Sequence, residues 1–129
     1  LMVTAITDGV RVSVVTEYHP DSTHVNPTHH AFTYRIRIEN RSENTVQLLR
    51  RHWTIYDSNG TVREVEGEGI VGQQPVLEPG EVHEYVSGCN LKTTMGKMVG
   101  TYLMERIIDG RRFRVTVPEF LLVVPYRLN

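Results

Sequence analysis

A glycine-rich segment carries the clearest chemical signal in this chain. It reads Gly67-Glu68-Gly69-Ile70-Val71-Gly72, the G-x-G-x-x-G spacing of dinucleotide-binding loops. In those loops the backbone approaches a pyrophosphate, and the following helix supplies N–H groups and partial positive charge. No helix is expected here, because Pro75 and Pro79 follow and proline in a helix interior costs about 3 kcal/mol or more. The segment therefore predicts positive φ angles or a close approach by another group, not a Rossmann fold.

The same glycines are candidates for ligand binding. The amides of Gly67, Gly69 and Gly72 could form a nest that accepts a phosphate or another anion. The competing interpretation is a bulge or tight turn that needs the glycines for its geometry alone. We favour the second interpretation, because neighbouring carboxylates would repel an anion unless a cation intervened.

Those carboxylates alternate along the chain. Glu64, Glu66 and Glu68 would project from one face of an extended strand, about 6.5 to 7 Å apart. Because Mg²⁺ prefers carboxylate and water ligands, a weak Mg²⁺ or Co²⁺ site is one hypothesis for the three residues. A solvated strand face produces the same pattern without a ligand, and this simpler interpretation is the one we favour.

Histidines near two prolines form a second group of metal-ligand types. His24, His29 and His30 follow His19 within a dozen residues, and imidazole is a good ligand for cobalt, nickel or zinc. Their spacing matches no zinc signature, and a polar loop tolerates histidine freely. We therefore treat them as weaker metal candidates than the glutamates.

The sequence points to no catalytic residue. Cys89 could be a loop nucleophile, but no histidine and carboxylate that would activate it can be identified. His52 and His83 fall within strand patterns and have no recognisable acid–base partner. The balance favours a protein that is not an enzyme.

We expect these residues to lie on β-strands and on the turns between them. Apolar and polar residues alternate over 10–15 and 32–39, and a further apolar set lies in 46–55, where Trp53 is the expected central core aromatic. Asp109-Gly110 between 102–108 and 112–117 predicts a hairpin. Pro118 should lie at an edge, at a bulge or at a crossing between sheets. About eight short strands predict an all-β fold, a two-sheet antiparallel sandwich.

Composition limits the classes of function. The length suits one domain, spanning residues 2–129, and the single cysteine excludes an internal disulfide. The formal net charge is −1, so no basic field favours nucleic acid as a partner. We find neither a hydrophobic signal segment nor an apolar run long enough to cross a bilayer, and we expect a cytoplasmic protein that does not contact a membrane.

Several longer motifs occur in a recognisable order. They are Leu48 to Ile55, Glu64 to Pro75, Leu77-Glu78-Pro79-Gly80-Glu81, Tyr85-Val86-Ser87-Gly88, Met98 to Tyr102 and Phe113 to Phe120. In these motifs the chain resembles the ApaG family over nearly its whole length. The resemblance implies a fibronectin type III-like, or immunoglobulin-like, β-sandwich. It also implies a link to cobalt resistance and magnesium efflux, and relatives that are domains of F-box and polymerase-interacting proteins. It implies no established active site.

Two hypotheses about function follow. The first is a noncatalytic module that binds an unknown protein partner, with Glu64 to Pro75 as the expected surface and a family-implied role in divalent-cation resistance or efflux. Exposed β edges are also compatible with a homodimer. The alternative is a metal-dependent phosphate- or nucleotide-binding protein, or a weak phosphohydrolase. In it the glycine amides would hold the phosphate, and Glu66 and Glu68 would hold Mg²⁺ or Co²⁺.

Overall fold

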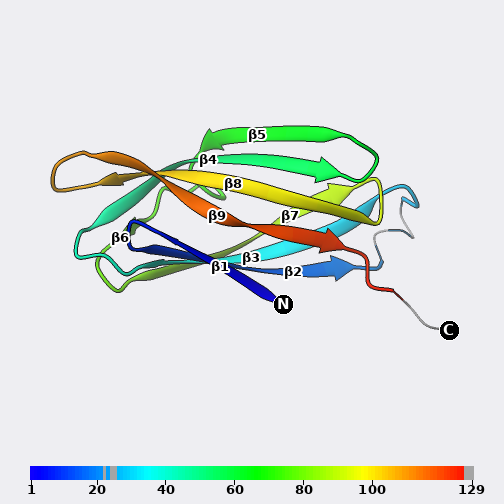
Figure 1. The fold of residues 1–129 in the computed structure, drawn as a ribbon, viewed down its shortest axis with the longest axis horizontal. Helices are drawn as coiled ribbons and strands as arrows, with labels where there is room; N and C mark the ends of the chain where they lie inside the picture. The colour runs from blue at the N-terminus through cyan, green and yellow to red at the C-terminus, as the bar shows by residue number, and fades with distance from the viewer. Residues whose placement is uncertain (22, 24–25, 127–129) are drawn as a thin grey trace.

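The computed structural model describes residues 1–21, 23 and 26–126, and within them the chain forms nine strands (Figure 1). The strands are β1 (Met2–Thr7), β2 (Val10–His19), β3 (His30–Asn40), β4 (Val46–Asp57), β5 (Val62–Glu68), β6 (Val76–Leu77), β7 (Val82–Leu91), β8 (Met95–Arg106) and β9 (Arg112–Val123). The longest reach 12 residues, so the strands are longer than the sequence pattern indicated.

Two antiparallel sheets face each other. One has the order β1-β2-β3-β7, and the other has the order β5-β4-β8-β9 with β6 paired to the beginning of β4. The predicted all-β, two-sheet antiparallel sandwich is thus confirmed. No helix within the described ranges is long and apolar enough to cross a membrane.

Alternating side chains from both sheets form the core. In β2 the inward residues Val10, Val12 and Val14 are fully buried or nearly so. Trp53 of β4 is 3% exposed and packs against Tyr34 of the opposite sheet and against Phe120 of its own sheet. Burial of each large apolar side chain contributes roughly 1.5 to 3 kcal/mol. The prediction that Trp53 is a central core aromatic is confirmed.

The β8–β9 hairpin forms where it was predicted, but its loop is longer than two residues. Strand β8 ends at Arg106, and the Gly110 amide donates to the Arg106 carbonyl at 2.8 Å, which closes the loop. The Asp109 carboxylate accepts hydrogen bonds from the Arg106 side chain and, at 3.1 Å, from the Arg111 amide. Gly110 has φ +68°. The turn signal located the hairpin correctly, whereas side-chain capping set its length.

Pro118 lies in an edge strand and at a bulge, as predicted. Strand β9 ends its sheet, and its register with β8 shifts between the Met98–Phe120 pair and the Gly100–Val117 pair. Proline is tolerated at such a position because its missing N–H breaks no ladder bond.

The two flanks of the sandwich differ. On one flank β9 contacts β1 and β2, and the Thr116 amide donates to Thr7 Oγ1 at 3.2 Å. On the other flank, the edge strands β5 and β7 border a cavity. This open flank positions the candidate site.

Candidate functional site

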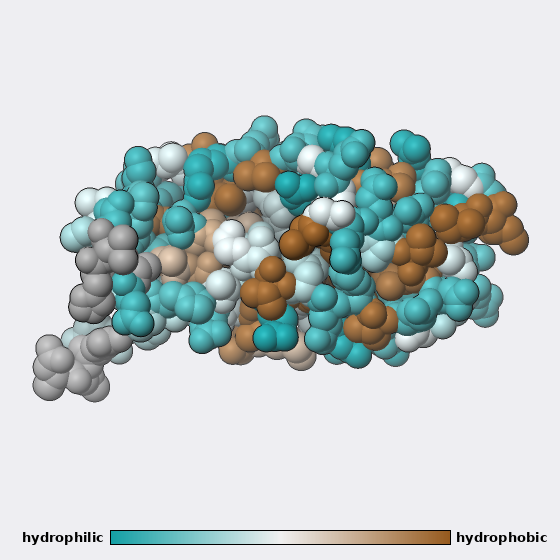
Figure 2. Space-filling view, turned by 180° about the vertical axis from the view of Figure 1, so that it is seen from behind, coloured by the Kyte–Doolittle hydropathy of each residue, from teal (hydrophilic) through white to brown (hydrophobic). Residues whose placement is uncertain are grey.

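A cavity of about 490 Å³ opens between β5 and β7. Seen from behind, the molecule has a recessed, partly apolar area in the middle of its face (Figure 2). The apolar and aromatic wall consists of Tyr34, Trp53, Ile55, Val65, Tyr85 and Met98. The volume of the cavity lies within the range of small-molecule pockets, which is roughly 300 to 1,000 Å³.

Strand register decides which residues of β4 and β5 face the cavity. Arg51, Trp53 and Ile55 are paired with Gly67, Val65 and Arg63 respectively, and every one of these residues except Gly67 lines the cavity. Since side chains alternate between the faces of a strand, the intervening residues point the other way.

Arg51 lies across the β5 backbone. Its Nη1 donates to the Glu68 carbonyl at 2.9 Å and to the Gly69 carbonyl at 3.1 Å. A Cβ on Gly67 would stand 3.0 Å from that nitrogen, so the glycine allows the guanidinium to approach closely. The expectation of a close approach at the glycine segment is therefore confirmed at Gly67.

Arg63 connects the two sheets at the other end of the cavity. Its Nη2 donates to the Asn90 carbonyl at 2.6 Å and lies 3.7 Å from Cys89 Sγ. Burial raises the pKa of the Cys89 thiol, and the nearby Arg63 charge opposes that shift. The raised pKa favours the protonated thiol over the thiolate, which is the nucleophilic form.

Neutral phenols line the cavity opposite Arg51. Tyr85 Oη lies 2.5 Å from Tyr102 Oη, and Tyr34 hydrogen-bonds to Ser87. Burial raises the pKa of both Tyr34 and Tyr85, although the Arg51 charge lowers each somewhat.

Among the described residues that line the cavity there is no carboxylate, so the charge of the cavity comes from Arg51 and Arg63. Such a site suits an anionic group beside an apolar one.

The rest of the glycine segment forms a tight turn. Ile70 and Gln73 exchange backbone hydrogen bonds, and Gly69 and Gly72 have φ of +63° and +74°. The predicted positive φ angles are therefore confirmed at these two glycines. The Gly69 amide donates to the Leu49 carbonyl at 2.8 Å, so it is not directed at a ligand.

Val71 occupies the tip of this turn with φ +46° and 65% exposure. A β-branched residue in the left-handed region is a true outlier, and such strain costs about 1 to 3 kcal/mol. Val71 lines the cavity, so the strained residue stands at its mouth.

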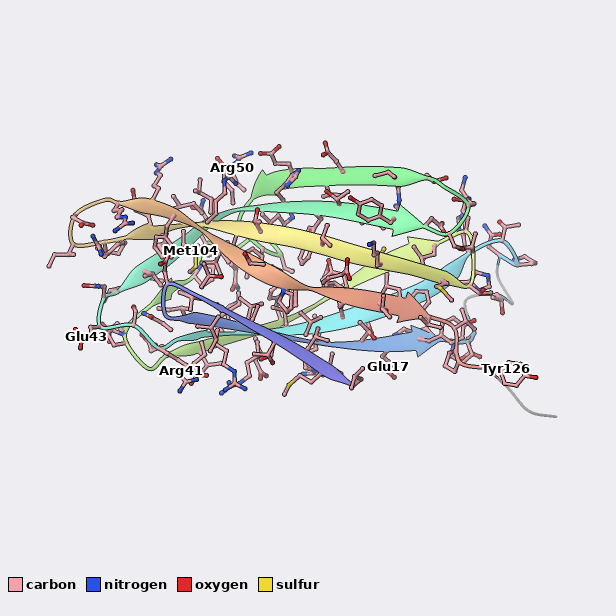
Figure 3. All side chains as sticks on the ribbon, viewed as in Figure 1. Glu17, Arg41, Glu43, Arg50, Met104 and Tyr126 are labelled. Atoms are coloured by element: carbon pink, nitrogen blue, oxygen red, sulfur yellow. The ribbon has the colours of Figure 1, made fainter. Side chains whose placement is uncertain are left out.

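The three glutamates share the outer face of β5, as predicted. Glu64 Oε1 lies 3.7 Å from His52 Nε2, and Glu66 Oε1 lies 4.0 Å from Arg50 Nη2. Arg50 points away from the space between the sheets (Figure 3). Within the described part of the chain, no three His, Cys, Asp or Glu side chains form a group that could hold a metal ion. Metal binding by Glu64, Glu66 and Glu68 stays a prediction.

His29 and His30 are not among the residues that line the cavity. His29 Nδ1 is 3.2 Å from Asn26 Nδ2, and the His30 ring packs near Tyr18, with centroids 6.4 Å apart. His24 lies outside the described residues. A metal role for these histidines also stays a prediction.

Sequence reasoning missed Arg51 and Arg63 as a pair. The overlooked signal is that Arg51 falls two residues before Trp53, and so on the same strand face as a buried aromatic. No local pattern places Arg63 on the wall of the same cavity.

Comparison with known proteins agrees with this architecture. The ApaG domain family matches residues 20–106. Protein ApaG of Anaeromyxobacter dehalogenans is 48% identical over 128 residues, which are 99% of this chain and 100% of that protein. Protein ApaG of Paramagnetospirillum magneticum is 47% identical over 131 residues, with the same coverage.

A crystal structure of an ApaA protein from Bordetella pertussis superposes with a TM-score of 0.86 at 42% identity, covering 92% of this chain and 95% of that one. The domain match over most of the chain, together with relatives almost half identical over their whole length, shows that this chain belongs to the ApaG family.

Proposed function

We propose that this protein is a noncatalytic binding module that takes a protein partner on its open flank, by adding an extended segment of that partner to the edge of β7. Strand addition supplies affinity through backbone hydrogen bonds and specificity through alternate side chains. The observation that carries the proposal is that β7 ends its sheet directly beside the cavity.

The backbone of β7 is oriented for such an addition. The Asn90 carbonyl accepts from Arg63 of β5, so the backbone groups of this residue face the open flank. In an antiparallel strand the N–H and C=O of one residue point to the same side, and alternate residues repeat that direction. Glu84, Val86 and Gly88 therefore direct their backbone groups to the same edge.

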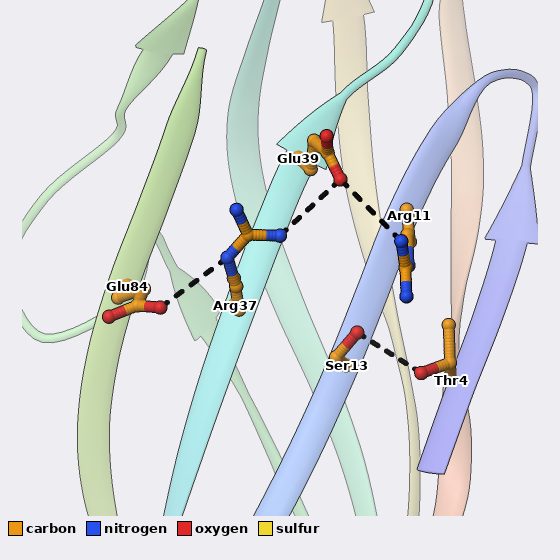
Figure 4. A network of polar contacts seen from close by, with 6 residues as sticks. All are labelled: Thr4, Arg11, Ser13, Arg37, Glu39 and Glu84. Carbon is orange, nitrogen blue, oxygen red and sulfur yellow. Dashed lines mark hydrogen bonds and ion pairs between the residues drawn. The ribbon is translucent and has the colours of Figure 1, made fainter. Parts of the chain in front are cut away.

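The edges formed by β5 and β9 are less suitable. Strand β5 carries Glu64, Glu66 and Glu68, and β9 carries Pro118 and a bulge, both of which discourage pairing. Strand β7 carries one acidic residue, Glu84, which pairs with Arg37 at 3.5 Å (Figure 4). Its Val82 and Val86 are 40% and 46% exposed.

The family-implied link to cobalt and magnesium fits this proposal as an indirect role. A binding module acts on ion levels through the partner that it engages, and we propose that this takes place in the cytoplasm. The alternative, a metal-dependent phosphate site at Gly67, Gly69 and Gly72, stays a prediction. Selective broadening of amide resonances in 64–72 by Co²⁺, reversed by Mg²⁺, would support it.

The test of the main proposal is a proline in the free edge. Val86→Pro removes an outward N–H without removing a ladder bond to β3, whereas Glu66→Pro makes the matched change on the β5 edge. A photo-crosslinking residue at position 82 should yield a discrete product with a partner in cells. We expect Val86→Pro to abolish this product and Glu66→Pro to retain it. A product that survives Val86→Pro would contradict strand addition, as would the absence of any product in the parent protein.

A further inference from the structure

We infer that the partner segment carries two acidic side chains four residues apart, with an apolar side chain midway between them, all facing the cavity. This inference rests on the proposed function, because it assigns the chemistry of the segment that would lie along β7.

The inward face of β5 provides the template. Along it stand Arg63, then Val65, and then Gly67, over which the Arg51 guanidinium lies. The order is therefore positive, apolar, positive at every second residue. The two charged positions are four residues apart, which is about 13 Å in a strand.

Neither guanidinium has a carboxylate partner in the described structure. Arg51 donates to two backbone carbonyls, and Arg63 donates to one carbonyl and contacts a thiol. The neutral carbonyls leave both positive charges uncompensated. An Arg–carboxylate pair is charge-assisted and two-pronged, and it is stronger where the site is partly shielded from water.

A strand added to β7 would lie opposite β5. Its side chains at i, i+2 and i+4 would point inward beside Tyr85 and Ser87, which line the cavity. The central side chain would meet Val65 and Trp53, whereas the outer two would meet Arg63 and Arg51. Charge and spacing thus select an acidic, apolar, acidic pattern.

A second copy of this chain fits the site poorly. Its β7 would present His83, Tyr85 and Ser87 inward, which offer no carboxylate. Its β5 would bring Arg63 toward Arg51, which is repulsive. Charge complementarity therefore favours an acidic partner segment over self-association.

The experiment uses labelled synthetic peptides and fluorescence anisotropy with the full chain. The test peptide alternates Thr with inward Glu, Leu and Glu, and has Lys at both ends for solubility. A second peptide carries Gln in place of both Glu residues, and a third carries both Glu residues on the outward face. We expect the test peptide to bind at least about tenfold more tightly than either control.

Charge variants assign the contact. Arg63→Gln should weaken binding of the test peptide about tenfold, whereas Arg50→Gln, on the outer face, should leave it unchanged. Arg63→Glu should prefer a peptide with one inward Lys, which a merely structural role for Arg63 would not produce. Removing the Arg51 side chain would disturb the β5 turn, so at this position we use Arg51→Lys, which keeps the positive charge. Circular dichroism checks that each variant is folded.

Each contrary outcome is distinct. Equal binding of Glu and Gln peptides, still sensitive to Val86→Pro, would overturn the acidic pattern and leave the proposed function standing. No binding of any peptide would overturn the pattern, and the crosslinking test would then decide the function separately. Free glutarate that binds through Arg63 regardless of Val86→Pro would indicate a small-molecule site. A dimer that dissociates in Val86→Pro would indicate a second copy, and either result would overturn the inference.

Discussion

Gly69 and Gly72 both adopt the left-handed backbone region, but their surroundings differ. A Cβ on Gly69 would lie 2.3 Å from the Gln73 carbonyl oxygen, whereas a Cβ on Gly72 would meet nothing within 4 Å. The same substitution at the two positions therefore separates backbone strain from steric exclusion.

We predict that Gly69→Ala destabilises the fold by about 3 kcal/mol or more, whereas Gly72→Ala costs about 1 kcal/mol. Both substitutions force alanine to a positive φ, and only the first adds a collision with backbone. Urea denaturation followed by Trp53 fluorescence measures the two losses. Equal losses of unfolding free energy would show that the turn relaxes around a Cβ at position 69 and that the collision with the Gln73 carbonyl is unimportant.

At the scale of elements, the β8–β9 hairpin shows how side chains determine a loop. Arg106 Nη2 and Asp109 Oδ2 lie 2.5 Å apart, and both residues flank the same turn. The Arg106 guanidinium, together with the Arg111 amide, lowers the pKa of the Asp109 carboxyl to about 2.

This shift predicts a dependence of hairpin stability on pH. A carboxyl whose pKa is lower in the folded state stabilises that state above its unfolded pKa of about 3.9. The contribution should be lost as the pH falls from about 4 through 2. It should be small, because the pair is exposed and screened by water.

Carbon-detected NMR titration of the Asp109 carboxyl measures the pKa directly. In Arg106→Gln it should rise toward the ordinary value, whereas Arg111→Gln should change it little because the Arg111 backbone is the donor. An unchanged pKa in Arg106→Gln would show that the Arg111 amide alone, or another group, holds the carboxylate.

At the scale of the whole molecule, one aromatic cluster holds the sheets together. Trp53 packs edge-on to Tyr34 across the interface and to Tyr102 and Phe120 within its own sheet. Gly100, its cross-strand neighbour on β8, leaves the room that the indole ring occupies. The wall of the cavity is therefore also the centre of the core.

We predict that Gly100→Ala destabilises the protein by about 1 to 3 kcal/mol and shifts the Trp53 emission, because a Cβ there would lie 2.4 Å from the ring. Gly88→Ala is the matched control in an edge strand, since its Cβ would approach only the Phe32 carbonyl at 3.5 Å. Thermal unfolding gives the stabilities. A Gly100→Ala protein as stable as the control would mean that Trp53 can repack.

The whole molecule has two exposed apolar regions to compare, the tip of the β8–β9 hairpin and the open flank. The β8–β9 hairpin tip projects from one end, and apolar atoms gather there (Figures 1 and 2). Ile108 in this tip is 83% exposed, whereas Val86 on the open flank is 46% exposed. Strand β9, which leads from this tip, carries Pro118 and a bulge, whereas β7 borders the cavity of about 490 Å³, so the proposal places recognition on the flank.

Local pattern located several strands and turns of this protein, although not their lengths. The alternation of Val10, Val12 and Val14 identifies one buried face, and Asp109-Gly110 locates a hairpin, because both signals depend on neighbours within a few residues. The alternation of Glu64, Glu66 and Glu68 likewise placed them on one face. For the same reason the glycine spacing indicated positive φ angles or a close approach, but it did not identify the neighbouring group or turn that requires them.

The contents of the open flank depend on how the two sheets pack against each other. The β4–β5 register places Arg51 and Arg63 at opposite ends of one cavity, and Tyr85 lines the same cavity from a strand of the opposite sheet. Register is set by the burial of a whole face, and sheet packing joins residues far apart in the chain. No local pattern carries that information, so the cavity, its two arginines and the free β7 edge became visible only when the chain was folded.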